Sequence, residues 1–227
     1  MISRARLTSV LREQSASKAA MIAGRLPLFG DMEFGGVPMS FDRNAEIYGE
    51  GESADYVYRV ISGSVRAYKV LNDGRRQITA FYLPGDVFGI ESGAEHSNSA
   101  EAIDKATILV VRRSSVFSTA ENNGDVARYL WSATAAELKR SQNHALLLIK
   151  TAKERIAAFL LEMAGRLAGQ SCVELPMSRQ DIADYLGLTI ETVSRTLTQL
   201  SERSTIQFLG SRRIVLRNPS QLRALNA

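Results

Sequence analysis

Three polar residues near the C-terminus have types and a spacing that suit contact with the edges of DNA bases. Glu191, Ser194 and Arg195 stand at i, i+3 and i+4, so they would share one face of a helix. An arginine can donate two hydrogen bonds to guanine O6 and N7, and a glutamate can accept one from cytosine N4. A Glu–Arg pair at this spacing is more often a solvated salt bridge, so the interpretation depends on the elements that carry it.

Two short helices are predicted to position these residues. Ser178 is a good N-cap for a helix that Gly187 ends, and Thr189 can cap a second helix over residues 190–200. The small Ala183 suits a close helix contact, and Val193 is an apolar anchor for the second helix. This pattern is typical of a helix-turn-helix, whose second helix enters the major groove with its N-terminal residues at the bases. The expected base-reading residues are Ile190, Glu191, Ser194 and Arg195.

The residues that follow predict a β-hairpin, the wing of a winged helix-turn-helix. Segments 206–209 and 212–216 flank the turn residues Gly210-Ser211. Arginines of this hairpin, and hydroxyls at the two helix starts, are suited to phosphate oxygens. The expected phosphate-binding residues are Ser178, Arg179, Thr189, Thr192, Arg212 and Arg213.

The charge distribution favours a polyanionic partner for the C-terminal part. The net charge of the chain is only +4, but residues 139–227 carry 13 Lys or Arg against 7 Asp or Glu. Residues 1–138 carry 15 against 17, so the basic excess lies beside the helix-turn-helix pattern. Together, motif and charge predict a domain over residues 151–227 that binds double-stranded DNA.

The N-terminal half predicts an antiparallel β-domain over residues 28–122. Short alternating runs, read as strands up to about residue 118, are separated by turn residues, and Asn72-Asp73-Gly74 indicates a tight hairpin. Many short strands at this spacing are typical of a sandwich or a small barrel. Residues 1–27 are expected to form a basic arm, with a transit peptide as the alternative.

Residues 123–150 predict one long helix with a narrow stripe at a 3–4 spacing. A narrow seam on a long helix favours pairing with a second copy of the chain, which predicts a homodimer. The alternative is a helix packed across its own β-domain. The expected dimerisation residues are Val126, Leu130, Ala133, Glu137, Arg140, His144 and Leu147.

Several function classes are disfavoured by composition. The chain has one cysteine, Cys172, and two histidines far apart, so neither a zinc site nor an iron–sulfur cluster is expected. A cupin-like barrel enzyme would need several histidine ligands, so no enzyme activity and no cofactor are expected. No apolar run is long enough to span a membrane, and the thiol count fits the cytoplasm.

Over nearly its whole length the chain resembles the CRP/FNR superfamily of transcription regulators. The resemblance implies an α+β fold with an N-terminal cyclic-nucleotide-binding-like β-roll, a long dimerisation helix and a C-terminal winged helix-turn-helix. In the β-part it rests on Gly51-Glu52, Tyr56, Ile61-Ser62-Gly63-Ser64-Val65 and Pro84-Gly85-Asp86-Val87-Phe88-Gly89. In the C-terminal part, Glu191-Thr192-Val193-Ser194-Arg195 is similar to the E-x-x-S-R of the FNR branch, and residues 181–195 look most like FixK-type regulators.

This resemblance implies an activator of microaerobic or nitrogen-fixation genes that works with RNA polymerase. The implied DNA site is a TTG…CAA inverted repeat, on which Arg195 and Glu191 would read the G·C pair and Ile190 would touch a thymine methyl. FixK-type proteins are active without a small effector.

Two departures from better-known branches bear on regulation. The N-terminal arm lacks the cysteines with which FNR holds its oxygen-sensing cluster. CRP holds cyclic AMP with a glutamate on the ribose and an arginine on the phosphate. Here Asp86 stands near the position of that glutamate, and Asn98-Ser99-Ala100 stands where CRP has Arg-Ser-Ala. The alternative is a regulator that needs an unidentified ligand in the β-roll. Cys172 is expected to be a buried strand residue, with a redox role as the other possibility.

Overall fold

The computed structural model describes residues 26–29, 32–167 and 172–226. The chain forms two compact units, the first made of residues 1–69 and 80–138, and the second of Val70–Thr79 and Lys139–Ala227. The expected N-terminal arm, residues 1–27, lies almost wholly outside the described residues. No helix in the described ranges is long and apolar enough to cross a membrane.

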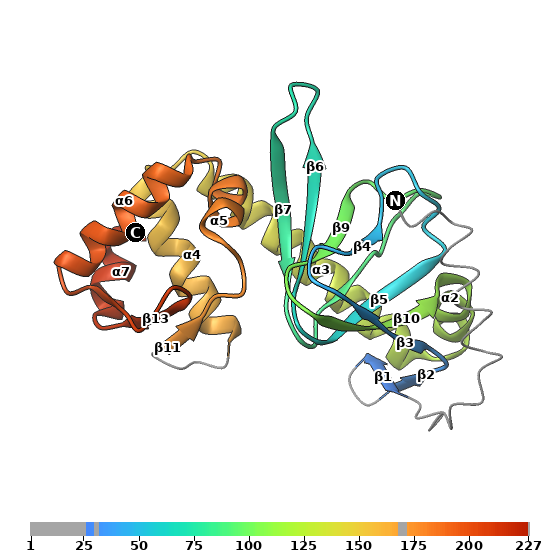
Figure 1. Cartoon of the computed structure of the whole chain (residues 1–227). Helices are drawn as coiled ribbons and strands as arrows, with labels where there is room; N and C mark the ends of the chain where they lie inside the picture. The colour runs from blue at the N-terminus through green and yellow to red at the C-terminus, as the bar shows by residue number, and fades with distance from the viewer. Residues whose placement is uncertain (1–25, 30–31, 168–171, 227) are drawn as a thin grey trace. The chain divides into compact units, whose positions relative to one another are not determined.

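The first unit is built on two antiparallel four-stranded sheets (Figure 1). One sheet has the order β3 (Val37–Phe41), β10 (Ala106–Arg112), β5 (Tyr56–Ser62) and β8 (Val87–Phe88). The other has the order β4 (Glu46–Tyr48), β9 (Ser99–Ala102), β6 (Val65–Val70) and β7 (Arg76–Tyr82). A separate hairpin joins β1 (Leu26–Phe29) to β2 (Met32–Phe34). The predicted β-roll is confirmed, including the hairpin of β6 and β7 around Asn72-Asp73-Gly74.

Apolar side chains from both sheets form one core cluster, including Ile47, Val60, Val65, Ile108 and Val110. They alternate with more exposed residues along the strands, as a sheet with one buried face requires. The turn from β5 to β6 depends on Gly63, whose φ is +79°. A Cβ at Gly63 would lie 2.5 Å from the carbonyl oxygen of Lys105, so a side chain would force the turn open.

The strands end earlier than predicted. The sequence predicted strand structure to about residue 118, but α2 (Arg113–Asn122) begins directly after β10. The reason lies in packing, because Val116 is the one buried residue of α2 and joins a second apolar cluster with Leu109, Val111 and Val126. A helix can bury this one side chain in the cluster while its other residues stay exposed. The contact with the cluster, and no local sequence signal, therefore favours a helix here over a strand. The predicted long helix follows as α3 (Gly124–Leu147).

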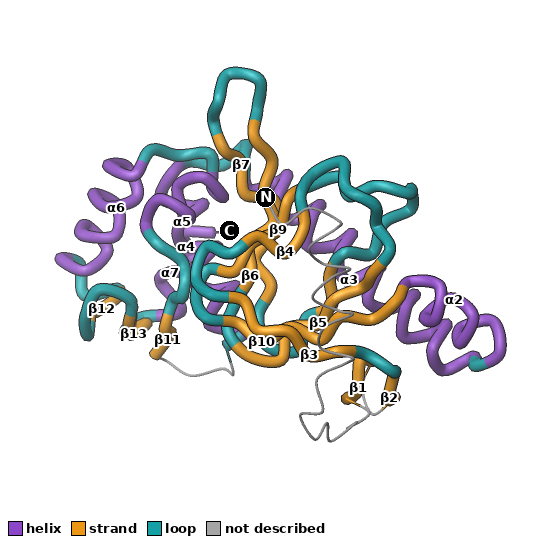
Figure 2. The backbone as a smooth tube through the Cα atoms, turned by 45° about the vertical axis from the view of Figure 1, so that its right-hand side comes forward, coloured by secondary structure: helices purple, strands orange, loops and turns teal. Residues whose placement is uncertain are grey.

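The second unit contains the winged helix-turn-helix (Figure 2). It comprises α4 (Ala152–Arg166), β11 (Cys172–Glu174), α5 (Arg179–Leu186), α6 (Ile190–Glu202), β12 (Ile206–Phe208), β13 (Arg213–Leu216) and α7 (Pro219–Asn226). The three strands form one antiparallel sheet in the order β11, β13, β12. The two helices of the motif, the strand at Cys172 and the wing were predicted, but α7 was not, although Pro219 is a good first helical residue.

Candidate nucleic-acid interface

Capping interactions define the first helix of the motif. The Ser178 hydroxyl accepts from the Asp181 N–H, and the Asp181 carboxylate accepts from the N–H and the hydroxyl of Ser178. This capping box satisfies donors that the helix start would otherwise leave unpaired. Gly187 ends α5 in the left-handed region at φ +61°, where glycine has no steric cost. The turn between the helices is therefore set by local chemistry.

The second helix keeps one face in the core and offers the other to solvent. Val193 and Leu197 are buried, and the Thr189 hydroxyl accepts from the N–H of Thr192 at the helix start. Glu191 and Arg195 are exposed, and neither side chain forms a hydrogen bond or ion pair with any residue that the structure describes. Ile190 is 37% exposed and Ser194 is half-buried. All four residues predicted to read bases lie on α6, and the charged pair remains available to a ligand.

The six residues predicted to bind phosphate fall into two groups. The hydroxyl of Ser178 serves the capping box, and the hydroxyls of Thr189 and Thr192 lie 3.0 Å apart from each other. Among the arginines, the guanidinium of Arg179 lies over the Phe208 ring of β12, 5.2 Å from its centroid, and its Nη1 is buried without a partner. In the wing, Arg213 is exposed and Arg212 is half-buried. Arg213 is thus the most accessible cation of this set.

One arginine that the sequence prediction missed holds the turn of the motif in place. Arg155 of α4 donates to the carbonyl oxygens of Leu148, Lys150, Leu186 and Gly187, at 2.6, 2.8, 2.7 and 3.3 Å. These carbonyls lie at or just beyond the C-terminal ends of α3 and α5, where helices carry unpaired acceptors and partial negative charge. Arg155 therefore ties the segment after α3 to the turn before α6. No sequence signal singles it out among the cations of α4.

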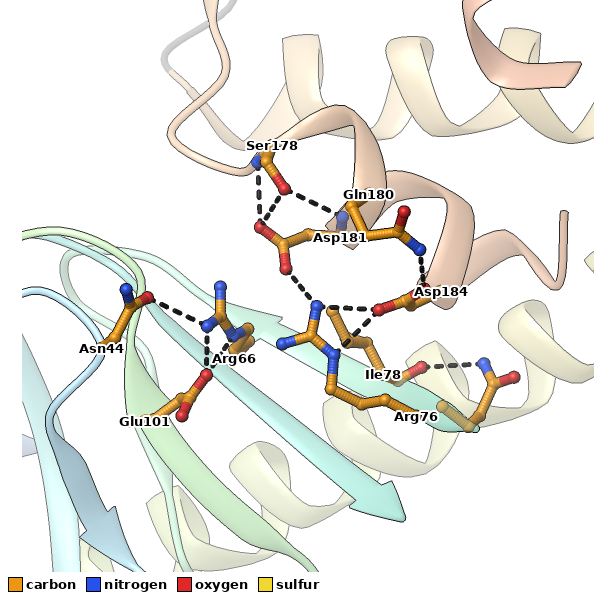
Figure 3. A network of polar contacts seen from close by, with 10 residues as sticks. Asn44, Arg66, Arg76, Ile78, Glu101, Ser178, Gln180, Asp181 and Asp184 are labelled. Atoms are coloured by element: carbon orange, nitrogen blue, oxygen red, sulfur yellow. Dashed lines mark hydrogen bonds and ion pairs between the residues drawn. The ribbon is translucent and has the colours of Figure 1, made fainter. Parts of the chain in front are cut away.

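The tip of the β6–β7 hairpin, residues Val70–Thr79, belongs to the same unit as the helix-turn-helix. There Arg76 donates to the carboxylates of Asp181 and Asp184 on α5 (Figure 3). Gln77 donates to the carbonyl oxygen of Tyr185 at 3.3 Å. The hairpin and both helices of the motif line a groove of about 760 Å³. The hairpin was predicted from its turn residues, but its contact with α5 was not.

The residues predicted for dimerisation lie on the face of α3 that packs against the chain itself. Val126 and Leu147 are 1% and 8% exposed, Leu130 packs on the second apolar cluster, and Glu137 accepts from the Tyr82 hydroxyl. The ring of His144 stacks on Tyr185, with centroids 4.1 Å apart. Ala133 and Arg140 are half-buried on the same face. The first part of this stripe thus packs on its own β-domain, as in the alternative interpretation, whereas His144 packs on α5 of the second unit.

A different stripe of α3 is open to solvent. Trp131 and Leu138 are 78% and 58% exposed, and Ile149, just beyond the helix, is 83% exposed. At about 100° per residue, Trp131 and Leu138 lie nearly opposite the buried stripe of α3. The helix thus has two apolar faces, and a sequence pattern alone does not say which one a second copy would cover.

Polar side chains of the β-roll that bear on ligand binding form contacts within the chain. The Asp86 carboxylate accepts from the N–H of Leu83 at 2.7 Å and closes its own turn. Arg66, the only buried arginine in the described part of the chain, forms an ion pair with Glu101 and donates to Asn44. Asn98 is half-buried and donates to the hydroxyl of Ser97. Within the described ranges the one buried arginine is thus already paired with a carboxylate and is not offered to a cyclic phosphate.

Cys172 is half-buried in β11, opposite Val215, rather than fully buried as expected. In the described ranges no three His, Cys, Asp or Glu residues come together in a way that could hold a metal ion.

A β-roll, a long helix and a winged helix-turn-helix, whose second helix exposes Glu191 and Arg195, define a DNA-binding transcription regulator. Residues 38–123 match the cyclic nucleotide-binding domain family, and residues 154–225 match the Crp-like helix-turn-helix domain family. The chain is similar to the nitrogen fixation regulation protein FixK of Azorhizobium caulinodans, with 50% identity over 198 residues, covering 85% of this chain and 80% of that protein.

Two further comparisons agree. FixK of Rhizobium meliloti is 46% identical over 181 residues, covering 79% of this chain and 82% of that protein. The structure of FixK2 from Bradyrhizobium japonicum matches with a TM-score of 0.82 and 54% identity over 85% of this chain and 98% of that one. The chain belongs to the CRP/FNR family of transcription regulators and is of the FixK type.

Proposed function

We propose that this protein, as a homodimer, binds a TTG…CAA palindrome and activates transcription of microaerobic or nitrogen-fixation genes. The observation that carries the proposal is the exposed, unengaged pair Glu191 and Arg195 at the start of α6. On a G·C pair the guanidinium would donate to guanine and the carboxylate would accept from cytosine. The names of the FixK relatives support the class of genes. Activation requires RNA polymerase as a partner, and the DNA target places the protein in the cytoplasm.

Dimerisation follows from the symmetry of the target. A palindrome is read by two copies of α6 whose half-sites lie about 34–36 Å apart. The stripe of Trp131, Leu138 and Ile149 is the apolar surface that a second α3 would cover. Trp131 and Leu138 are seven residues apart, a spacing that suits helix pairing because side chains at such an interval return to one side of a helix. We therefore assign the dimer seam to this stripe in place of the one expected from the sequence.

The engaged side chains of the β-roll support activity without a small effector. A cyclic nucleotide would have to break the pair of Arg66 and Glu101 or bind its phosphate without a buried cation. A charge-assisted hydrogen bond contributes about 1.5–3 kcal/mol, so its absence would weaken such a ligand considerably. The match of residues 38–123 to cyclic nucleotide-binding domains supports a second candidate function, a regulator that needs a different ligand in the β-roll.

A gel-shift titration with the purified chain tests the proposal. The protein is titrated on a TTG…CAA palindrome and on a duplex in which both half-sites are scrambled, with no small molecule added. A specific shift supports ligand-free recognition. A shift that appears only after a cell extract or a screened metabolite is added favours the second candidate. No specific shift under either condition contradicts both.

A further inference from the structure

One arginine outside the helix-turn-helix binds two carboxylates of its first helix. Arg76 begins β7, and its Nη2 lies 2.7 Å from Asp181 Oδ1 and 2.7 Å from Asp184 Oδ2. Its Nε lies 2.8 Å from the same oxygen of Asp184 (Figure 3). One guanidinium thus bridges two acids that lie almost one turn apart on α5, which is a geometry that lysine cannot reproduce.

Both acids pair with Arg76, and one of them is deeply buried. The side chain of Asp181 is 3% exposed, and its second oxygen holds the N-cap residue Ser178. The side chain of Asp184 is 13% exposed and accepts from Gln180 at 2.6 Å. A buried carboxylate without its cation is strongly destabilising, so loss of Arg76 would disturb the start of α5.

The two acids also lie on a helix where negative charge would oppose the binding of DNA. In helix-turn-helix complexes the first helix crosses the DNA backbone. Two uncompensated carboxylates on that helix would repel phosphates, and the guanidinium of Arg76 neutralises part of their field. The groove between the hairpin and the motif is lined by Arg76 and Asp184 together with Thr189–Thr192, so the pair lies close to the start of the recognition helix.

We propose that Arg76 is a positioning residue for DNA recognition, which orders α5 and neutralises its carboxylates so that α6 is presented to DNA without an effector. The inference rests on the proposed function and adds that a contact within the chain, in place of a bound effector, holds α5 in its DNA-binding arrangement. Arg76 acts through Asp181 and Asp184 rather than on phosphate, because its Nε and Nη2 are engaged and its side chain is only 25% exposed.

The test is Arg76→Gln in the full-length chain, with binding measured by fluorescence anisotropy on the palindrome and on a random duplex across a salt series. We expect affinity for the palindrome to fall about tenfold and affinity for random DNA to fall much less. The slope of log K against log salt should stay unchanged, because no phosphate contact is lost. Amide exchange in α5, measured without DNA, should become faster.

Three further variants sharpen the test. Arg75→Gln is the matched control, because Arg75 is 77% exposed and pairs with Asp73 of its own turn, so the ratio of specific to random binding should hardly change. Arg76→Lys should recover only part of the loss, since it restores charge without the bridge. Asp184→Asn combined with Arg76→Gln should lose no more than Arg76→Gln alone, because the two residues act as a unit.

Three results would overturn the inference. The first is equal loss on both duplexes with a salt slope lower by about 1, which would make Arg76 a phosphate ligand. The second is additive losses in the double variant. The third is unchanged α5 exchange together with unchanged binding in Arg76→Gln. If the unmodified chain fails to bind the palindrome, the proposed function fails, and the exchange data still decide whether Arg76 orders α5.

Discussion

Replacing Leu138 with alanine should weaken the dimer while leaving the fold of each protomer intact. Leu138 is 58% exposed on the open stripe of α3, so most of its apolar surface remains to be buried by a partner. The buried stripe behaves differently. Leu147 is only 8% exposed, so Leu147→Asp would bury a charge and unfold the chain instead of separating two copies.

The size of the effect follows from the exposed surface. Full burial of a leucine contributes about 1.5–3 kcal/mol, so a residue with roughly 60% of its surface left would contribute about 1–1.7 kcal/mol. Both protomers lose this contribution, and the remaining methyl group retains a part of it, which leaves about 1.5–2.5 kcal/mol per dimer. The dissociation constant of the dimer should therefore rise about 10- to 60-fold.

Sedimentation equilibrium over a concentration series measures this constant directly, and circular dichroism checks that the protomer stays folded. Phe117→Ala is the control, because Phe117 is 47% exposed on α2 and lies outside the stripe. The dimer dissociation constant of the Phe117→Ala protein should match that of the unmodified chain. A Leu138→Ala protein that is folded and dimerises as tightly as the control would refute the assignment of the seam to the stripe of Trp131, Leu138 and Ile149.

Three other predictions concern recognition, the motif turn and pH. Arg195→Ala should weaken binding to the palindrome by about 1–3 kcal/mol and to random DNA far less, measured by anisotropy; equal losses would mean that Arg195 contacts only phosphate. Arg155→Met should lower the free energy of unfolding in urea by about 2–4 kcal/mol, because it leaves carbonyls unpaired, whereas Lys153→Met on the same helix should change it little. Burial lowers the pKa of His96, against the opposing effect of Glu91, so the folded state keeps this ring neutral. The unfolded chain protonates at about pH 6.5, so stability is complete above that pH and falls as the pH drops toward the folded-state pKa. His96→Phe, which keeps a ring against Tyr48, should flatten this dependence in urea titrations, and an unchanged dependence would exclude His96 as its source.

Local signals in the sequence account for much of the DNA-binding domain. Ser178, Gly187 and Thr189 each act within a few residues of their own position, by capping a helix or by adopting a left-handed turn. Such interactions need no distant partner, which is why both helices of the motif could be placed from the residue pattern. The hairpin at Asn72-Asp73-Gly74 was predictable for the same reason.

Other features depend on residues far apart in the chain. Arg76 and Asp184 are separated by 108 positions, and Arg155 donates to carbonyl oxygens both before and after its own helix in the sequence. Neither residue differs in sequence context from an ordinary surface arginine, so their roles emerge only from the folded arrangement.

The sequence by itself determined the β-domain, the long helix and the boundaries of the helix-turn-helix, and it predicts the residues that face DNA, because capping, turns and helical periodicity are short-range effects. Only the tertiary structure decided which of the two apolar faces of α3 stays open, where the strands give way to α2, and which cations hold α5. Those outcomes depend on which surfaces meet after the chain has folded. The periodic pattern of α3 is compatible with burial of either apolar face, and the packing of the rest of the chain decides which one is covered.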